Sequence, residues 1–153
     1  MNKIIKSISF AAAVQITLPS LAATSIDSQI RERLDFIENT WNAGKAAELA
    51  KEIYVPSTQI TGEGVDQIYA STEDVSALVA GLVKDNKHVK IDLNSTQQVS
   101  NDVVVSWVTW TVTPTSKDAQ PFNMKSLFVW KNTGKRWNIV ADMYTSGVIA
   151  KTE

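Results

Sequence analysis

Apolar residues at helical spacing dominate the first part of the chain. The apolar positions of residues 25–41 recur every three or four residues, which predicts an amphipathic helix that the Ser25 hydroxyl can cap. A shorter helix is predicted over residues 45–54, stopped by Pro56, and a third begins at Ser71, whose hydroxyl can cap it. The three apolar stripes are Ile26, Ile30, Leu34, Ile37 and Trp41; Ala46, Leu49, Ala50 and Ile53; and Val75, Leu78, Val79, Leu82 and Val83.

Later residues change to a period of two, which is typical of strands. Residues 89–93 alternate between apolar and polar side chains. Residues 103–113 are rich in valine, threonine and tryptophan and carry apolar residues on both faces, which predicts a central strand. Residues 122–130 and 136–144 predict two further strands, joined by a hairpin turn at the Asn-Thr-Gly-Lys segment of residues 132–135. Among the helices, only residues 58–61 are predicted to be extended.

The order of these elements indicates an α+β fold. Helices that precede a run of strands favour a cone-shaped, curved antiparallel sheet wrapped around the three N-terminal helices. We expect residues 23–153 to form this single domain. A curved sheet facing helices can enclose a cavity between the two layers.

Residues 1–22 have the pattern of a cleavable secretory signal peptide. Lys3 and Lys6 give a positive start, and the apolar run of residues 7–18 is too short to span a membrane. Ser20 and Ala22 are small residues at the spacing that signal peptidase requires. We therefore expect a periplasmic or secreted protein. The alternative is a buried N-terminal helix of the domain.

The charge of the chain argues against a nucleic-acid partner. The formal net charge is −1, and removal of Lys3 and Lys6 with the signal peptide would lower it to −3. A weakly acidic domain lacks the basic surface that binds phosphate backbones. No segment after the signal peptide is apolar enough to predict a membrane span.

The scarcity of metal-binding residue types argues against a metal site. The chain has no cysteine, and His88 is its only histidine, so a zinc site is not expected. A Ser-His-Asp triad would depend on His88, which lies in a polar, lysine-flanked stretch. We expect no cofactor and no metal ion.

Two segments of the chain resemble the nuclear transport factor 2-like superfamily. Residues 41–50 (WNAGKAAELA) followed by Tyr54-Val55-Pro56 resemble its helix-turn-helix opening, although Lys45 replaces the usual aspartate. Residues 134–142 (GKRWNIVAD) resemble its closing hairpin, and the resemblance extends over residues 25–146. An exported bacterial relative of the polyketide cyclases and ketosteroid isomerases is implied. The resemblance also implies a pocket at the open end of a cone and a homodimer formed through the sheet.

The catalytic positions of this superfamily look vacant. Aligned on the two motifs, the ketosteroid isomerase tyrosine, base and second acid fall on Ile37, Gly62 and Ser126. Glu63 is the one weak candidate for a general base, and a solvated loop acid is its simpler interpretation. Alternation along the last strand places Asp142 opposite Ile139 and Met143, which favours a salt-bridged or dimer-interface carboxylate.

The function predicted from these patterns is binding. We expect an exported, non-catalytic domain that binds a small hydrophobic ligand or a protein partner through its cone. The alternatives are a filled core with no pocket, and an isomerase-, cyclase- or hydrolase-type enzyme that uses Glu63 as base. The residues predicted to line the pocket are Ile37, Trp41, Tyr54, Tyr69, Met124, Ser126, Phe128, Ile139, Ala141 and Met143.

Overall fold

Three helices and five strands build the domain. The computed structural model describes residues 24–150; the predicted signal peptide lies outside the described residues. The helices are α1 (Ile26–Asn42), α2 (Ala46–Ile53) and α3 (Thr72–Asp85). The strands are β1 (Tyr54–Gly62), β2 (Asn86–Ser100), β3 (Val103–Pro114), β4 (Phe122–Asn132) and β5 (Trp137–Ser146).

The helix starts follow the caps that the sequence predicts. The Ser25 hydroxyl accepts a hydrogen bond of 3.2 Å from the backbone N–H of Ser28 at the start of α1. The Ser71 hydroxyl accepts one of 3.0 Å from the N–H of Asp74 at the start of α3. Gly44 ends the first helical segment with a φ of 71°, a left-handed conformation that glycine adopts without a steric penalty.

The five strands form one mixed sheet in the order β1-β5-β4-β3-β2. β3 lies inside the sheet, as its apolar pattern predicts. Strand β1 pairs in parallel with β5, whereas the other neighbours are antiparallel, so the prediction of a wholly antiparallel sheet is wrong at this edge. β1 is also longer than residues 58–61. Pro56 disfavours helical geometry at the residue before it, and the chain is already extended at Tyr54.

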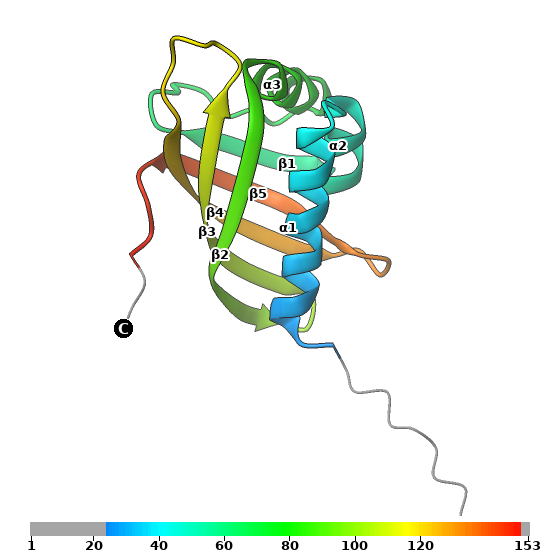
Figure 1. The fold of residues 1–153 in the computed structure, drawn as a ribbon. Coiled ribbons are helices and arrows are strands. Elements are labelled where there is room, and N and C mark those ends of the chain that lie inside the picture. Colours follow the sequence, from blue (N-terminus) through cyan, green and yellow to red (C-terminus); the bar gives the residue numbers. More distant parts are fainter. Residues whose placement is uncertain (1–23, 151–153) are drawn as a thin grey trace, which may run out of the picture.

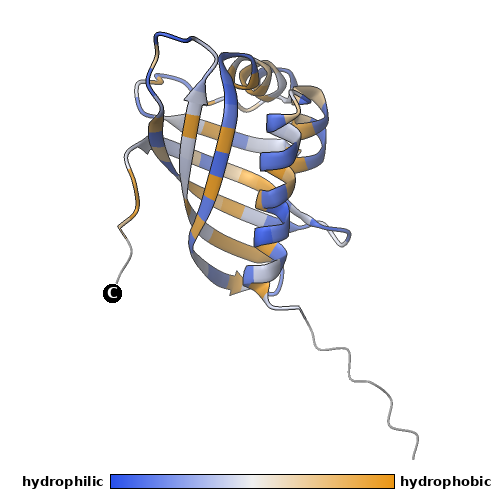
Figure 2. Ribbon diagram, in the orientation of Figure 1, coloured by the Kyte–Doolittle hydropathy of each residue, from blue (hydrophilic) through white to orange (hydrophobic). Residues whose placement is uncertain are grey.

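All three helices cover the same face of the sheet. Figure 1 shows α1 lying across the strands and α2 with α3 at one end of them. Bands of apolar residues cross the strands beneath α1 in Figure 2. The residues buried between these layers include Ile30 and Leu34 of α1 together with Val108, Phe128 and Trp130 of the sheet, all with no exposed surface. Each such side chain contributes about 1.5–3 kcal/mol of hydrophobic stabilisation.

A β-bulge interrupts the pairing of β4 with β5. Val129 pairs with Ala141 and Trp130 pairs with Ile139, so Val140 has no partner of its own. One extra residue in a strand moves every later side chain to the other face. The alternation that begins at Ile139 is therefore reversed after the bulge.

This reversal corrects the predicted faces of β5. Ile139 is fully buried under the helices, and Asp142 lies on that same inner face instead of the opposite one. Met143 is on the outer face and is 57% exposed, and Ala141, two residues before it on the same strand, is on the outer face as well. The prediction that Ala141 and Met143 point into the cone is therefore wrong.

No helix within residues 24–150 has the length and the hydropathy needed to cross a membrane.

Candidate functional site

A cleft of about 120 Å³ lies between the helices and the inner face of the sheet. It is formed at the end of the sheet where α1 and α3 finish, and all five strands supply residues to its walls. We call this site the cleft. Its lining residues are Trp41, Tyr54, Leu82, Asn86, Trp110, Val112, Phe122, Met124, Ser126, Asp142 and Tyr144.

Two tryptophans form one aromatic wall of the cleft. The ring centroids of Trp41 and Trp110 are 5.8 Å apart, with the ring planes inclined at 54°. Trp41 Nε1 donates a hydrogen bond of 2.8 Å to the carbonyl oxygen of Asn86, and Trp110 Nε1 donates one of 3.2 Å to Ser126 Oγ. Since both indole N–H groups are bonded within the protein, the ring surfaces are what these residues offer to a ligand.

Asp142 is the exceptional polar group of the cleft. Its Oδ1 atom has no solvent contact and no hydrogen-bond partner, the one such side-chain atom in the part of the chain that the structure describes. Burial raises the pKa of this carboxyl to about 8, and the nearby Ser126 hydroxyl opposes the shift only in part. The carboxyl is therefore mainly protonated at neutral pH.

Two tyrosines flank Asp142. Burial raises the pKa of the Tyr54 hydroxyl, and the charge of Asp142 raises it further. The pKa of Tyr144 is also raised, first by burial and then by the neighbouring Tyr69 and Asp142. Both hydroxyls consequently stay neutral at physiological pH.

Gly62 holds the ring of Tyr144 in place. The two residues are paired between β1 and β5, and a Cβ atom at position 62 would lie 2.2 Å from a ring carbon of Tyr144. Only glycine leaves room for this packing. The position that the resemblance aligns with a catalytic base is thus occupied by a residue that makes space for an aromatic ring.

The ten predicted lining residues divide into three groups. Trp41, Tyr54, Met124 and Ser126 line the cleft. Ile37, Phe128 and Ile139 are buried in the hydrophobic core instead. Tyr69 bridges to Ile60 beside β1, and Ala141 and Met143 are on the outer face.

Sequence reasoning missed several residues of the cleft. Trp110 and Val112 follow the inward alternation of Val104 and Val108 along β3, which would have identified them. Asp142 and Tyr144 were hidden by the bulge at Val140, because alternation counted from Ile139 places them outside. The others missed are Leu82, Asn86 and Phe122.

The structure corrects the interpretation of Glu63 as a general base. Its Oε2 atom accepts hydrogen bonds from Thr145 Oγ1, Ser146 N and Ser146 Oγ at 2.9, 2.7 and 2.6 Å. These bonds to the ionised form lower the pKa of the exposed carboxylate to about 2. A group with so low a pKa is a poor base at neutral pH, and Glu63 is not among the lining residues. It ties the end of β1 to the end of β5.

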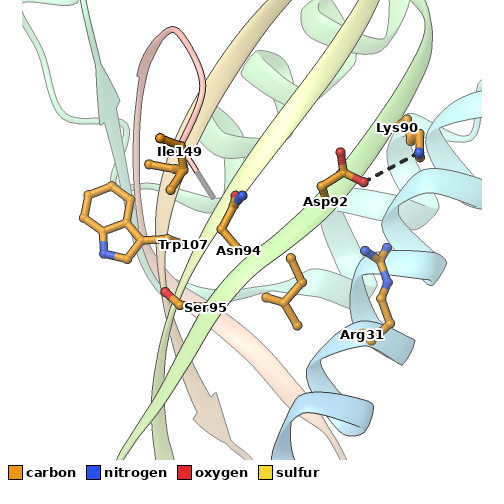
Figure 3. Close-up of a pocket in the computed structure, with 9 residues that line it drawn as sticks. Arg31, Lys90, Asp92, Asn94, Ser95, Trp107 and Ile149 are labelled. Carbon is orange, nitrogen blue, oxygen red and sulfur yellow. Dashed lines mark ion pairs between the residues drawn. The ribbon is translucent and has the colours of Figure 1, made fainter. Parts of the chain in front are cut away.

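A larger hollow of about 880 Å³ lies outside the cone and carries no free charge among its lining residues. Figure 3 shows Arg31 and Lys90 there, apart from Trp107 and Ile149. Arg31 forms ion pairs of 2.8 Å with Asp35 and with Glu38, and Lys90 pairs with Asp92 at 3.6 Å. Because these charges are satisfied within the protein, the hollow is a weaker candidate than the smaller cleft.

Within residues 24–150, no three acidic or histidine side chains are grouped in a way that would bind a metal ion.

No protein-family model and no curated protein sequence matches the chain. Solved structures do match its fold. A ketosteroid isomerase-like protein from Erwinia carotovora atroseptica superposes with a TM-score of 0.66 over 80% of this chain and 96% of its own, at 11% identity. A nuclear transport factor 2-like protein of unknown function from Shewanella oneidensis gives 0.65 over 78% and 98%, at 12% identity.

A third similar structure is a candidate scytalone dehydratase from Novosphingobium aromaticivorans, with a TM-score of 0.65 over 83% of this chain and 87% of its own, at 10% identity. At these identities the likeness concerns the fold alone. The chain has the nuclear transport factor 2-like fold, an α+β cone, as the sequence resemblance predicts. Its function has to be argued from its own cleft.

Proposed function

We propose that this protein is an exported, non-catalytic domain that binds a small, mainly apolar molecule in the cleft. The observation that carries the proposal is an aromatic cleft that contains one buried carboxyl with a free oxygen. Ligand sites are typically concave and apolar with a few oriented polar groups. The volume of about 120 Å³ is of the same order as the ~150 Å³ cavity that takes up benzene in an engineered protein, so the buried part of the ligand is about one ring in size.

A binding role is supported by the lack of a proton-transfer pair in the cleft. Proton transfer in the known isomerases uses a carboxylate base together with separate hydrogen-bond donors. Among the residues that line this cleft, Asp142 is the only carboxyl, and Glu63 lies outside. Ile37 is buried in the core and has no polar group, so it takes over no missing role, and a Ser126 hydroxyl alone does not replace the set.

The alternative function is an enzyme of the isomerase, cyclase or hydrolase type. It is supported by the ketosteroid isomerase-like and dehydratase names of two structural neighbours and by a carboxyl that is protonated near neutral pH. In such an enzyme Asp142 would donate a proton or a hydrogen bond to a small hydrophobic substrate. Turnover of a steroid, polyketide or epoxide substrate that is abolished by Asp142→Asn would replace the binding proposal with this one.

Native mass spectrometry of the protein purified from its own host tests the binding proposal. We expect a co-purified small molecule. Leu82 is 36% exposed at the edge of the cleft, so Leu82→Trp should block entry without disturbing the core, whereas Leu82→Met should retain the ligand. A ligand that remains bound to Leu82→Trp at the level of Leu82→Met would contradict the proposal.

Export is part of the proposal and has its own test. The support is the order of charge, apolar run and small residues in the sequence of residues 1–22. N-terminal sequencing of the protein from periplasmic and extracellular fractions should find a chain that begins at residue 23 or 24. An uncleaved chain in the cytoplasm would contradict it.

The outer face of the sheet supports a homodimer. Trp107, Leu127 and Met143 are paired neighbours across β3, β4 and β5, and Trp107 and Met143 are 40% and 57% exposed. An apolar row of this kind on a sheet face is typical of an interaction surface. In analytical ultracentrifugation we expect a dimer that Met143→Lys converts to a monomer and that Gln59→Lys does not. A monomeric wild-type protein would contradict this assignment.

A further inference from the structure

The charges around the cleft restrict the kind of ligand it accepts. Of its eleven lining residues, none is lysine, arginine or histidine, and Asp142 is the only one that can become negatively charged near neutral pH. Any charge that the site gains is therefore negative. A ligand with an anionic head would meet no counter-charge there.

The hydrogen-bond inventory points in the same direction. The indole N–H groups of Trp41 and Trp110 are bonded to Asn86 and Ser126, and Asn86 Nδ2 donates to the carbonyl oxygen of Leu82 at 3.0 Å. A bound oxyanion needs several free donors. Here the nitrogen donors are used within the protein, so a ligand meets neutral hydroxyls and one free buried acceptor, Asp142 Oδ1.

Aromatic rings supply the remaining surface. Trp41, Trp110, Tyr54, Tyr144 and Phe122 all line the cleft, and the two indoles are in mutual contact at 5.8 Å. The face of an aromatic ring is negative, so a cation within about 6 Å of its centroid is attracted. Aromatic rings around one carboxylate are the usual chemistry for binding substituted ammonium groups.

We infer that the ligand of this cleft is a small organic ammonium ion, whose charged head lies among the aromatic rings with Asp142 as its counter-ion. The inference rests on the proposed binding function and names the class of ligand. The uncharged part of the ligand extends toward Leu82 and Phe122, which are 36% and 40% exposed.

Binding of a cation requires that Asp142 lose its proton. The other titratable groups that line the cleft are Tyr54 from β1 and Tyr144 from β5, both neutral; α1, α3, β2, β3 and β4 supply residues that do not titrate. Since the pKa of Asp142 is about 8, the ionised fraction that can bind a cation grows about tenfold per pH unit below that value. Affinity for a permanent cation should therefore rise with pH up to about 8 and then level off.

Choline and 3,3-dimethylbutan-1-ol form a matched pair of probes, because they share a shape and differ in charge. Titration of the purified protein by calorimetry or tryptophan fluorescence should show at least tenfold tighter binding of choline at pH 8. Choline affinity should fall about tenfold from pH 7 to pH 6, while the alcohol should respond weakly and in the opposite direction.

Variants distinguish the contribution of the Asp142 charge to binding from the contribution of the shape of the cleft. Asp142→Asn should weaken the binding of choline at least tenfold at pH 8 and leave the affinity for the alcohol unchanged. Asp92→Asn, at a solvated ion pair, should alter neither affinity. Leu82→Trp should exclude both probes. If Asp142→Asn does not fold, the pH series on the wild-type protein carries the same test.

The outcomes distinguish the inference from the function on which it rests. Binding of the alcohol as tightly as choline, or choline affinity that is independent of pH and of Asp142, would overturn the ammonium inference and leave the cleft as a binding site. Failure of both probes to bind at millimolar concentration would count against both.

Discussion

The two ends of the inner sheet face contain the same tryptophan–serine contact in different surroundings. In the core, Trp130 of β4 donates through Nε1 to Ser106 of β3 at 2.9 Å, and neither residue is exposed. In the cleft, Trp110 of β3 donates to Ser126 of β4 at 3.2 Å, and Trp110 is partly exposed. The same tryptophan-to-serine hydrogen bond thus occurs twice between β3 and β4, with β4 as the donor strand in the core and β3 as the donor strand in the cleft.

What differs between the two ends is the packing around this contact. The core end is filled by Phe128 and Ile139, and its polar groups are bonded; the buried Thr58 hydroxyl, for example, donates to the Ile139 carbonyl at 2.7 Å. The cleft end leaves a cavity and a carboxyl oxygen without a partner. Buried unsatisfied groups lower stability, so their retention marks functional sites more often than structural ones.

Removal of the two indoles should give the largest contrast. Trp130→Ala should cost about 3–5 kcal/mol of unfolding free energy, because it opens a cavity in a filled core. Trp110→Ala should cost about half as much, since its ring already borders a cavity. Urea denaturation of both variants measures the difference, and equal losses would show that the cleft end is packed as tightly as the core.

Asp142 should make stability depend on pH. The folded-state pKa of about 8 exceeds the unfolded value near 4, so between these values the folded protein keeps a proton that the unfolded chain has lost. Stability should therefore fall as pH rises from about 4 to about 8, by at most about 1.4 kcal/mol per pH unit.

Asp142→Asn removes this dependence and should be increasingly more stable than the wild type toward pH 8. Denaturation curves at four pH values test the sign, with Asp92→Asn as the control. A wild-type protein that gains stability over this range relative to Asp142→Asn would contradict a raised pKa.

Gly62 should be intolerant of any side chain while Tyr144 is present. A Cβ atom 2.2 Å from the ring forces the ring to move, and such overpacking costs about 1–3 kcal/mol. Gly62→Ala should therefore destabilise the protein less in a Tyr144→Ala background. A double-mutant cycle measures the coupling between the two positions. Strictly additive losses of unfolding free energy would show that a side chain at position 62 does not clash with the Tyr144 ring.

The two serines should give the smallest contrast. Ser106→Ala leaves the fully buried Trp130 N–H without an acceptor, at a cost of about 1–3 kcal/mol. Ser126→Ala should cost less than about 1 kcal/mol, because water in the open cleft can accept from Trp110. The comparison would be reversed if Ser126→Ala proved the more damaging of the two.

Local patterns predicted much of the fold, and four of the eleven residues that line the cleft are among the predicted lining residues. Ser25 and Ser71 cap helices where expected, and Gly134 lies in the turn between β4 and β5 with a φ of 85°. Trp41 and Ser126 line the cleft, and each belongs to an uninterrupted period. Ile37 and Phe128 share those periods and yet lie in the core, since periodicity identifies a face and not a position along it.

The sequence by itself determined which residues form helices, which form strands and which face of most of them is apolar, because these depend on neighbours along the chain. The tertiary structure alone decided that β1 runs parallel to β5, that Val140 bulges, and that Asp142 consequently enters the cleft. Strands β1 and β5 are distant in the sequence, so their pairing depends on the tertiary structure. The bulge lies within the β4–β5 hairpin, but the alternation of apolar and polar residues carries no sign of it. For that reason no local pattern could reveal the buried carboxyl on which the proposed function depends.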